Sequence, residues 1–302
     1  MRLGIIGLSE GNGHPFSFSA IINGYDREAF GRAGWPGILD YLEQQPPDAF
    51  GFPDVRVTHA WTQDAEITAK LCAAARIAHP VGAFEDMLGA VDAAIIARDD
   101  WTTHMRLARP FLDRGVPVFI DKPLSLDATE LAYFMPHLEA GRLMSTAGLR
   151  YARELDALRE QPESLGRVGY IAATVLNNLE RYGVHMLDAI QGLGFPPVRR
   201  VTRLAATHES FAFDLANDTL VVLNCLGPVG KTFHISVFGE RGHAHFDLHD
   251  NFSAFRRTLA GFTDMLTTRK PPIPPHQILA TMRLLAAAQQ LAPAESWDAP
   301  DA

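Results

Sequence analysis

The first half of the chain alternates between short, almost continuously apolar runs and longer segments with helical periodicity. The apolar runs cover residues 3–8, 56–61, 91–97 and 116–120. Runs of this kind are typical of strands buried on both faces, as in a parallel sheet. Helical stripes lie between them, for example over 102–114. This alternation predicts βαβ units and an α/β fold with a Rossmann-like, doubly wound parallel sheet.

The pattern changes near residue 150. Apolar residues then recur in strand-like segments without long helices between the later ones. These segments are 168–176, 199–207, 219–225, 232–238 and 243–248. We therefore expect a C-terminal α+β domain with an open, mainly antiparallel sheet. The boundaries predicted are 1–148 for the dinucleotide-binding domain and 149–302 for a domain that binds substrate and forms oligomers.

Two helices are expected to close the chain. Phe252, Phe255, Leu259, Phe262 and Leu266 form one apolar stripe, and a second stripe covers 278–289. The connector at 271–275 contains four prolines, which a helix cannot cross. The tail from residue 293 is expected to be loose.

Charge and cysteine content limit the classes of partner. The 302 residues carry 27 Lys and Arg against 35 Asp and Glu, a net charge of -8, and no basic stripe is present. This argues against nucleic acid and favours a small-molecule substrate. Only Cys72 and Cys225 are present, so a disulfide framework is excluded and a reducing compartment, the cytoplasm, is expected. No apolar run reaches the length of about 18 residues that a membrane span needs.

A glycine-rich turn follows the first predicted strand. In a dinucleotide site such a turn lets backbone N–H groups and a helix N-terminus approach the pyrophosphate. The strict G-x-G-x-x-G spacing is absent, because Ser9 and Asn12 follow Gly7 where glycines are usual. Gly11 and Gly13 can do similar work in a longer loop. An ordinary strand-to-helix turn is the alternative.

The acidic residue that usually contacts the ribose is missing from the tip of the second predicted strand. Thr62 stands at this tip, and Asp64 is the nearest carboxylate. The choice between NAD and NADP therefore stays open.

Two further motifs, together with the glycine loop, resemble the Gfo/Idh/MocA family of NAD(P)-dependent oxidoreductases. Asp121-Lys122-Pro123 follows a buried strand, where the family carries Glu-Lys-Pro. The stretch from Gly183 through His185 to Asp188 matches the family's G-x-H-x-x-D. The family's late β-turn, near residues 237–242, and its final helices also have counterparts.

The resemblance implies a dehydrogenase or reductase that acts on a sugar, sugar-derivative or polyol-like alcohol. It adds Arg98, His104, Asp121 and Lys122 to the expected cofactor-binding residues. Arg98 and the residue after it replace a common Thr-Pro pair. Arg181 stands where many members carry an aspartate, so the family's catalytic set is incomplete.

Hydride transfer from an alcohol needs a base that takes the hydroxyl proton. It also needs a hydrogen-bond donor that stabilises the developing alkoxide. His185 can exchange a proton near neutrality, and Lys122 can donate a hydrogen bond. If 182–193 is helical, Asp188 shares a face with His185 and can orient it. Asn177, at the end of a strand, is a further candidate for substrate binding. We expect these groups to meet at a cleft between the domains.

Several alternatives stay open. The altered loop and Arg181 also suit a non-catalytic ligand-binding or regulatory protein, or a lyase or hydrolase with tightly bound NAD.

A metal hypothesis arises from His243, His245, His249 and Asp247. Alternating histidines on an exposed strand face are the simpler account, so no metal is predicted. The insertion at 26–53 could be a substrate lid or a subunit contact. The open sheet face predicts a homodimer or homotetramer.

Overall fold

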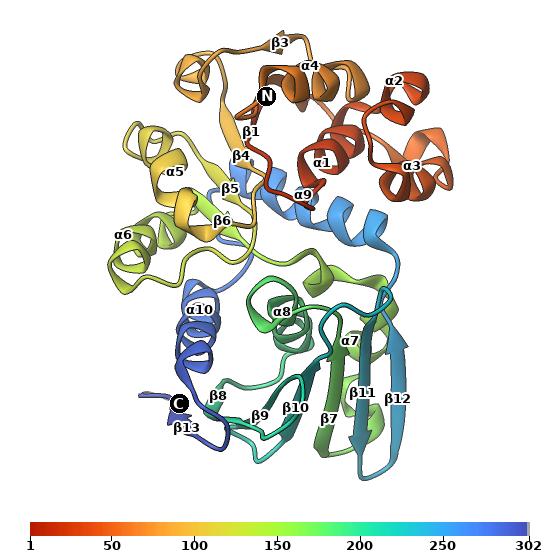
Figure 1. The fold of residues 1–302 in the computed structure, drawn as a ribbon, viewed down its shortest axis with the longest axis vertical. Helices are drawn as coiled ribbons and strands as arrows, with labels where there is room; N and C mark the ends of the chain where they lie inside the picture. Colours follow the sequence, from red (N-terminus) through yellow and green to blue (C-terminus); the bar gives the residue numbers. More distant parts are fainter. Residues whose placement is uncertain (301–302) are drawn as a thin grey trace. The chain divides into compact units, whose positions relative to one another are not determined.

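The computed structural model describes residues 1–300 and divides into two compact units (Figure 1). Among the described residues, the first unit comprises 1–125, 129–146 and 255–275, and the second comprises 126–128, 147–254 and 276–300. The chain thus leaves the first unit briefly at 126–128 and again after residue 146, and it returns to that unit for residues 255–275. Nothing in the described chain is a helix long and apolar enough to span a membrane.

The first unit is built on a six-stranded, wholly parallel sheet in the order β3-β2-β1-β4-β5-β6. Its strands are β1 (Arg2–Ile6), β2 (Arg56–Trp61), β3 (His79–Pro80), β4 (Ala93–Ile96), β5 (Val118–Ile120) and β6 (Leu143–Ser145). Every residue of β4 and β5 is buried, as the continuous apolar runs predicted. The chain moves outward in opposite directions from β1 and β4, so these two strands flank the switch point at which such sheets bind ligands.

The helices of this unit are α1 (His14–Asn23), α2 (Arg27–Gly31), α3 (Pro36–Glu43), α4 (Ala65–Ala74), α5 (His104–Leu112) and α6 (Ala128–Glu139). The 26–53 insertion forms α2 and α3. Trp35 stacks near Phe16 of α1 with ring centroids 6.0 Å apart, and the Tyr41 hydroxyl donates to the Ser17 hydroxyl over 2.5 Å. The insertion is therefore packed onto α1.

Helix α9 (Asn251–Thr268) explains why the chain returns to the first unit. Its predicted apolar stripe brings Phe255 within 5.3 Å of Phe18 in α1, and Phe262 within 5.8 Å of Phe119 in β5, measured between ring centroids. These aromatic contacts add α9 to the core of the first unit. The helix stops before the proline-rich connector, as expected, and α10 (Pro275–Gln290) begins after it.

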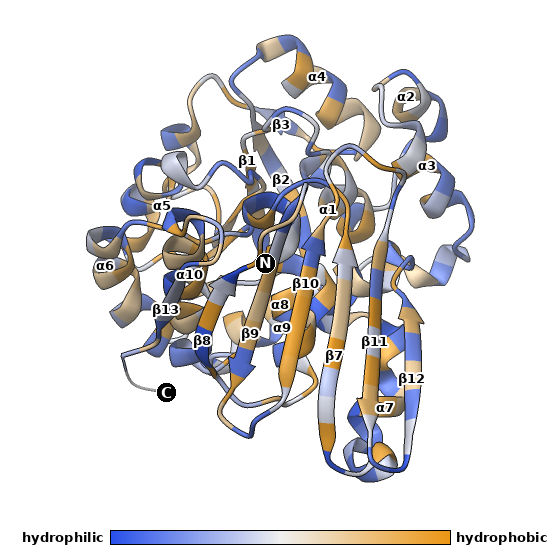
Figure 2. Ribbon diagram, turned by 60° about the horizontal axis from the view of Figure 1, so that its bottom comes forward, coloured by the Kyte–Doolittle hydropathy of each residue, from blue (hydrophilic) through white to orange (hydrophobic). Residues whose placement is uncertain are grey.

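The second unit carries a seven-stranded sheet in the order β12-β11-β7-β10-β9-β8-β13 (Figure 2). Its strands are β7 (Val168–Val175), β8 (Val198–Arg203), β9 (Glu209–Leu215), β10 (Leu220–Cys225), β11 (Phe233–Gly239), β12 (Gly242–Asp247) and β13 (Ser296–Asp298). Only β7 and β10 pair in parallel, so the expected mainly antiparallel sheet is confirmed. Short α7 (Asp156–Glu160) and α8 (Val184–Gly192) complete the unit with α10.

Two expectations for this unit were wrong. The tail from residue 293 is not loose, because Trp297 of β13 pairs with Val201 at the edge of β8. A three-residue strand is too short to show a period, so only its partner reveals it. The strand expected over 199–207 ends at Arg203, and a separate strand, β9, follows it.

Candidate functional site

The glycine loop leaves β1 at Gly7, whose φ of +81° suits glycine. A Cβ atom at Gly7 would lie 2.4 Å from Cδ of Arg98, so no larger residue fits there. Gly11 has a φ of +74°, and a Cβ atom there would meet nothing within 4 Å. Gly13 differs, since its Cβ position is 2.4 Å from Ile38 and is covered by α3. The open part of the loop is therefore at Gly11.

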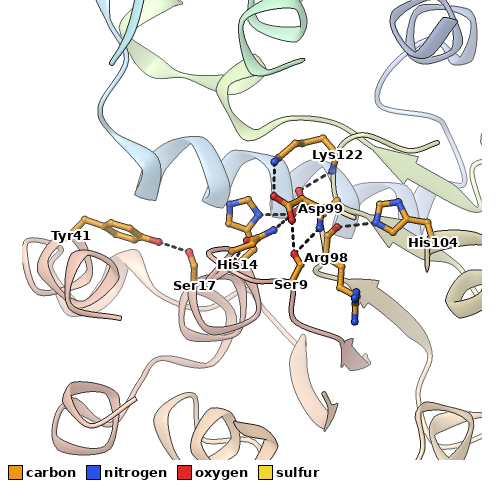
Figure 3. A network of polar contacts seen from close by, with 10 residues as sticks. Ser9, His14, Ser17, Tyr41, Arg98, Asp99, His104 and Lys122 are labelled. Carbon is orange, nitrogen blue, oxygen red and sulfur yellow. Dashed lines mark hydrogen bonds and ion pairs between the residues drawn. The ribbon is translucent and has the colours of Figure 1, made fainter. Parts of the chain in front are cut away.

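Ser9 ties this loop to the loop that follows β4 (Figure 3). Its hydroxyl donates to Oδ1 of Asp99 over 2.5 Å and accepts from the Asp99 backbone N–H over 3.1 Å. Because β1 and β4 flank the switch point, this bond joins the two loops that border the expected ligand crevice. Asp99 was not predicted as a site residue, and its only sequence signal was its position beside Arg98.

Lys122 lies at the end of β5 and is 4% exposed. Its Nζ is 3.4 Å from Oδ2 of Asp99, which is equally buried. The lysine is thus not a surface residue that happens to follow a strand. Its ammonium is held in the polar cluster that also contains Ser9 and the glycine loop (Figure 3).

Asp121 anchors the start of α1. Its Oδ2 accepts from the Asn12 amide over 3.0 Å and lies 2.5 Å from Nδ1 of His14. Burial alone would raise the pKa of Asp121, but His14, Lys122 and the Asn12 amide outweigh it and hold this pKa well below its usual range. The carboxylate is therefore ionised at neutral pH, beside the loop expected to hold a phosphate.

The remaining expected cofactor residues of this unit make internal contacts. Arg98 forms a two-pronged pair with Asp100, with Nε–Oδ1 and Nη2–Oδ2 distances of 2.7 and 2.5 Å. His104 is fully buried, with its ring nitrogens 3.0 and 2.9 Å from the carbonyl oxygens of Leu124 and Arg98. Burial lowers the pKa of His104, while the two carbonyl contacts act to raise it. Both partners are acceptors, so a neutral ring donates to only one of them.

At the tip of β2, both predicted residues support local structure. Asp64 caps α4 by accepting from the N–H groups of Glu66 and Ile67. Thr62 is buried against Thr68. Gln63, which the sequence did not single out, holds the glycine loop in place. Its side-chain amide donates to the Leu8 carbonyl over 2.6 Å, and its side-chain carbonyl accepts from the Leu8 N–H.

In the second unit, a π-helical turn (Leu179–Gly183) leads into α8 and places His185 in the first turn of α8. The imidazole is 8% exposed and lies edge-on to Phe233, with ring centroids 5.8 Å apart. Asp188, one turn further on, accepts from Nη1 of Arg150 over 2.8 Å and from the Ala147 N–H over 2.7 Å. It therefore holds the segment around Arg150 against α8.

Asn177 lies exposed at the end of β7 with a φ of +62°. It exchanges two backbone hydrogen bonds with Gly227, of 2.7 and 3.0 Å, which fix this turn.

The four residues of the metal hypothesis are on or next to β12, where His243 and His245 have ring centroids 5.0 Å apart. Among residues 1–300, no group of three metal-ligating side chains could hold an ion.

The first unit has a Rossmann-type fold with a glycine loop at the switch point of its sheet. Residues 30–142 match the Gfo/Idh/MocA oxidoreductase family, which is described by its NAD-binding Rossmann fold, and the likeness covers this segment. No curated protein matches the chain by sequence.

Solved structures resemble the chain over nearly its whole length. Myo-inositol dehydrogenase from Corynebacterium glutamicum is 13% identical with a TM-score of 0.75, and the match covers 100% of this chain and 99% of that one. Myo-inositol 2-dehydrogenase from Lactobacillus plantarum is 14% identical with a TM-score of 0.75, covering 96% of each chain. Scyllo-inositol dehydrogenase from Lactobacillus casei, solved with NAD(H) and scyllo-inositol, is 13% identical with a TM-score of 0.74, covering 96% of each.

Proposed function

We propose that this protein is an NAD(P)-dependent oxidoreductase that transfers hydride between a nicotinamide and a polyol-like or sugar-like alcohol. The observation that carries the proposal is the buried Lys122 ammonium at the end of β5, beside the glycine loop of a Rossmann sheet. The full-length likeness to inositol dehydrogenases supports the substrate class. The nicotinamide, when bound, accepts or supplies the hydride.

The chain's own residues have defined tasks in this proposal. Gly7 and Gly11 allow backbone to approach the pyrophosphate, and Ser9 and Asn12 hold the loop in place. Lys122 donates a hydrogen bond to the oxygen that gains charge as the C–O bond changes order. Asp99 keeps the ammonium in position through the contact at Nζ.

His185 remains our candidate for the proton-transferring group and Asn177 for a substrate contact, and both assignments stay predictions. Asp188 is better described as a positioning residue, because Arg150 and the Ala147 N–H already occupy its carboxylate oxygens.

Thermal unfolding with NAD, NADH, NADP or NADPH tests cofactor binding directly. The dinucleotide that binds should stabilise the protein by about 2.7 kcal/mol at 100 times its Kd. A Gly7→Val variant should lose this shift, because its side chain would collide with Arg98. The Gly37→Ala variant is the control, since a Cβ atom there meets nothing within 4 Å. If none of the four dinucleotides shifts the transition, the proposal is wrong.

We also propose that the protein forms a homo-oligomer through the outer face of the second sheet. Tyr170 and Phe238 are 37% and 38% exposed on this face, and their rings stack with centroids 5.7 Å apart. Register places Leu220 beside Tyr170, and Val222 beside Ala172, on the same face. An exposed apolar face of this kind is typical of a subunit interface.

Phe238→Glu should therefore lower the sedimenting mass to that of a monomer, because the new carboxylate would be buried without a partner. Val229→Glu is the matched control, since Val229 is 42% exposed in a loop. A wild-type protein that sediments as a monomer would contradict the proposed interface.

The cytoplasm is the compartment that we propose. Cys72 and Cys225 are both buried with free thiols, and burial raises their pKa values to about 11 and about 12, with Glu209 adding to the shift at Cys225. Cell fractionation tests this assignment.

A further inference from the structure

The second unit contains a cavity between the inner face of its sheet and two helices. Its walls come from α8, α10 and the strands β8, β9 and β10, and β13 closes one side. Phe213 and Val221 form the floor on the sheet and are fully or almost fully buried. Ile190 of α8 and Leu284 of α10 face them across the cavity, and Trp297 of β13 lies at its edge.

The cavity has the size and surface of an apolar ligand site. Its volume is about 130 Å³. An engineered apolar cavity of about 150 Å³ stays free of water and binds benzene, so a space of this size accepts one six-membered ring. Most of its lining residues are aliphatic, aromatic or proline, which favours a hydrocarbon ring over a polyol.

One cation also lines the cavity. Arg283 projects from α10 and is exposed to solvent, and its side chain forms no hydrogen bond or ion pair within residues 1–300. Other arginines of this unit are engaged: Arg200 pairs with Asp298, and Arg203 donates to the Leu291 carbonyl. A guanidinium beside an apolar pocket is suited to a carboxylate, which it can bind through two parallel hydrogen bonds.

We propose that this cavity is a second ligand site, which binds a small aromatic or alicyclic carboxylate. The ring lies against Phe195, Val198 and Trp297, which are half-buried apolar residues of the lining, and the carboxylate lies at Arg283. This ligand class differs from the polyol proposed as substrate, and the site uses none of the residues assigned to the cofactor.

The cavity is also distinct from the candidate catalytic residues of α8. Leu187, Ile190 and Gln191 line the cavity and lie on one side of the helix, at spacings of three and four residues. His185 lies about 120° or more around the helix from each of them, because each residue advances the helix by about 100°. Asp188 is closer, at about 60° from Gln191, and both of these side chains accept from Nη1 of Arg150. A ligand in the cavity therefore leaves His185 in place.

Isothermal titration of the cofactor-free protein with sodium benzoate tests the proposal, with benzyl alcohol as the neutral probe of similar shape. Benzoate should bind once per chain and about two- to fivefold tighter than benzyl alcohol, because Arg283 is exposed and water screens the attraction between its charge and the carboxylate. Arg283→Gln should abolish this preference and leave the binding of benzyl alcohol unchanged. Arg167→Gln, which removes an exposed arginine paired with Glu240, should change neither affinity.

A second variant tests the cavity itself. Ala280 lines the cavity but is exposed on α10, so Ala280→Trp should block the site without unfolding the protein. Both probes should then fail to bind, while the melting temperature stays near that of the wild type. The proposal is overturned if benzoate does not bind at millimolar concentration, or if Ala280→Trp leaves its binding intact. Because no dinucleotide or alcohol substrate is present, these results are independent of the proposed function.

Discussion

Lys122→Met is expected to lower kcat by about 100- to 1,000-fold, while the dinucleotide still binds. Methionine keeps the unbranched stem in its buried position but removes the ammonium that lies 3.4 Å from Asp99. Loss of one donor to a developing oxyanion costs about 100- to 1,000-fold in kcat. The measurement is steady-state reduction of NAD or NADP with an inositol, beside cofactor-dependent melting of the same variant.

Lys231→Met is the control, because Lys231 is exposed in the loop between β10 and β11. It should retain wild-type turnover. A fall of less than tenfold for Lys122→Met would show that the lysine only supports the structure. A loss of cofactor-dependent stabilisation together with kcat would assign Lys122 to cofactor binding instead of chemistry.

Asp121→Asn is expected to lower the free energy of unfolding by about 3 kcal/mol at pH 7. The change removes a buried negative charge that accepts from Asn12 and faces His14, and breaking such a pair leaves its partner uncompensated. Urea unfolding gives the difference directly. Asp218→Asn breaks only an exposed pair with Arg199 and should cost about 0.5 kcal/mol or less.

The pH dependence of this difference follows from the depressed pKa of Asp121. A carboxyl group whose folded-state pKa lies below its unfolded value stabilises the protein fully above the unfolded value, which is about 3.9. That contribution is lost as the pH falls through the lower, folded-state value. Wild type and Asp121→Asn should therefore differ by a constant amount from about pH 5 to 7 and converge only in strong acid. A difference that disappears between pH 7 and pH 5 would contradict this assignment.

Hydrophobic periodicity predicted the fold well where a single pattern, strand-like or helical, runs through a whole segment. The continuous apolar runs at β4 and β5 are buried in the sheet, and the stripe on α9 packs as expected. Prediction failed where the pairing of one strand with another decides the structure. Trp297 becomes a strand residue only because the edge of β8 is available, and no local pattern in three residues records that edge.

The candidate site was predicted in part, for a related reason. Motif spacing identified Lys122 and the glycine loop, since each follows a strand of the parallel sheet. It could not identify Asp99 or Gln63, whose partners Ser9 and Leu8 are far away in the sequence. Nor could motif spacing show that the Arg98 guanidinium pairs with Asp100, or that the ring nitrogens of His104 contact backbone carbonyl oxygens.

From the sequence alone one obtains the Rossmann-like first unit, the mainly antiparallel second sheet and the family of the first unit, because hydrophobic period and strand-end motifs are local properties of the chain. The tertiary structure decided which charges meet. It placed Asp99 beside Lys122 and His14 beside Asp121, and it left Arg283 at the edge of an apolar cavity. The physical reason is that burial and charge pairing depend on distances between segments far apart in the sequence, and no local pattern encodes those distances.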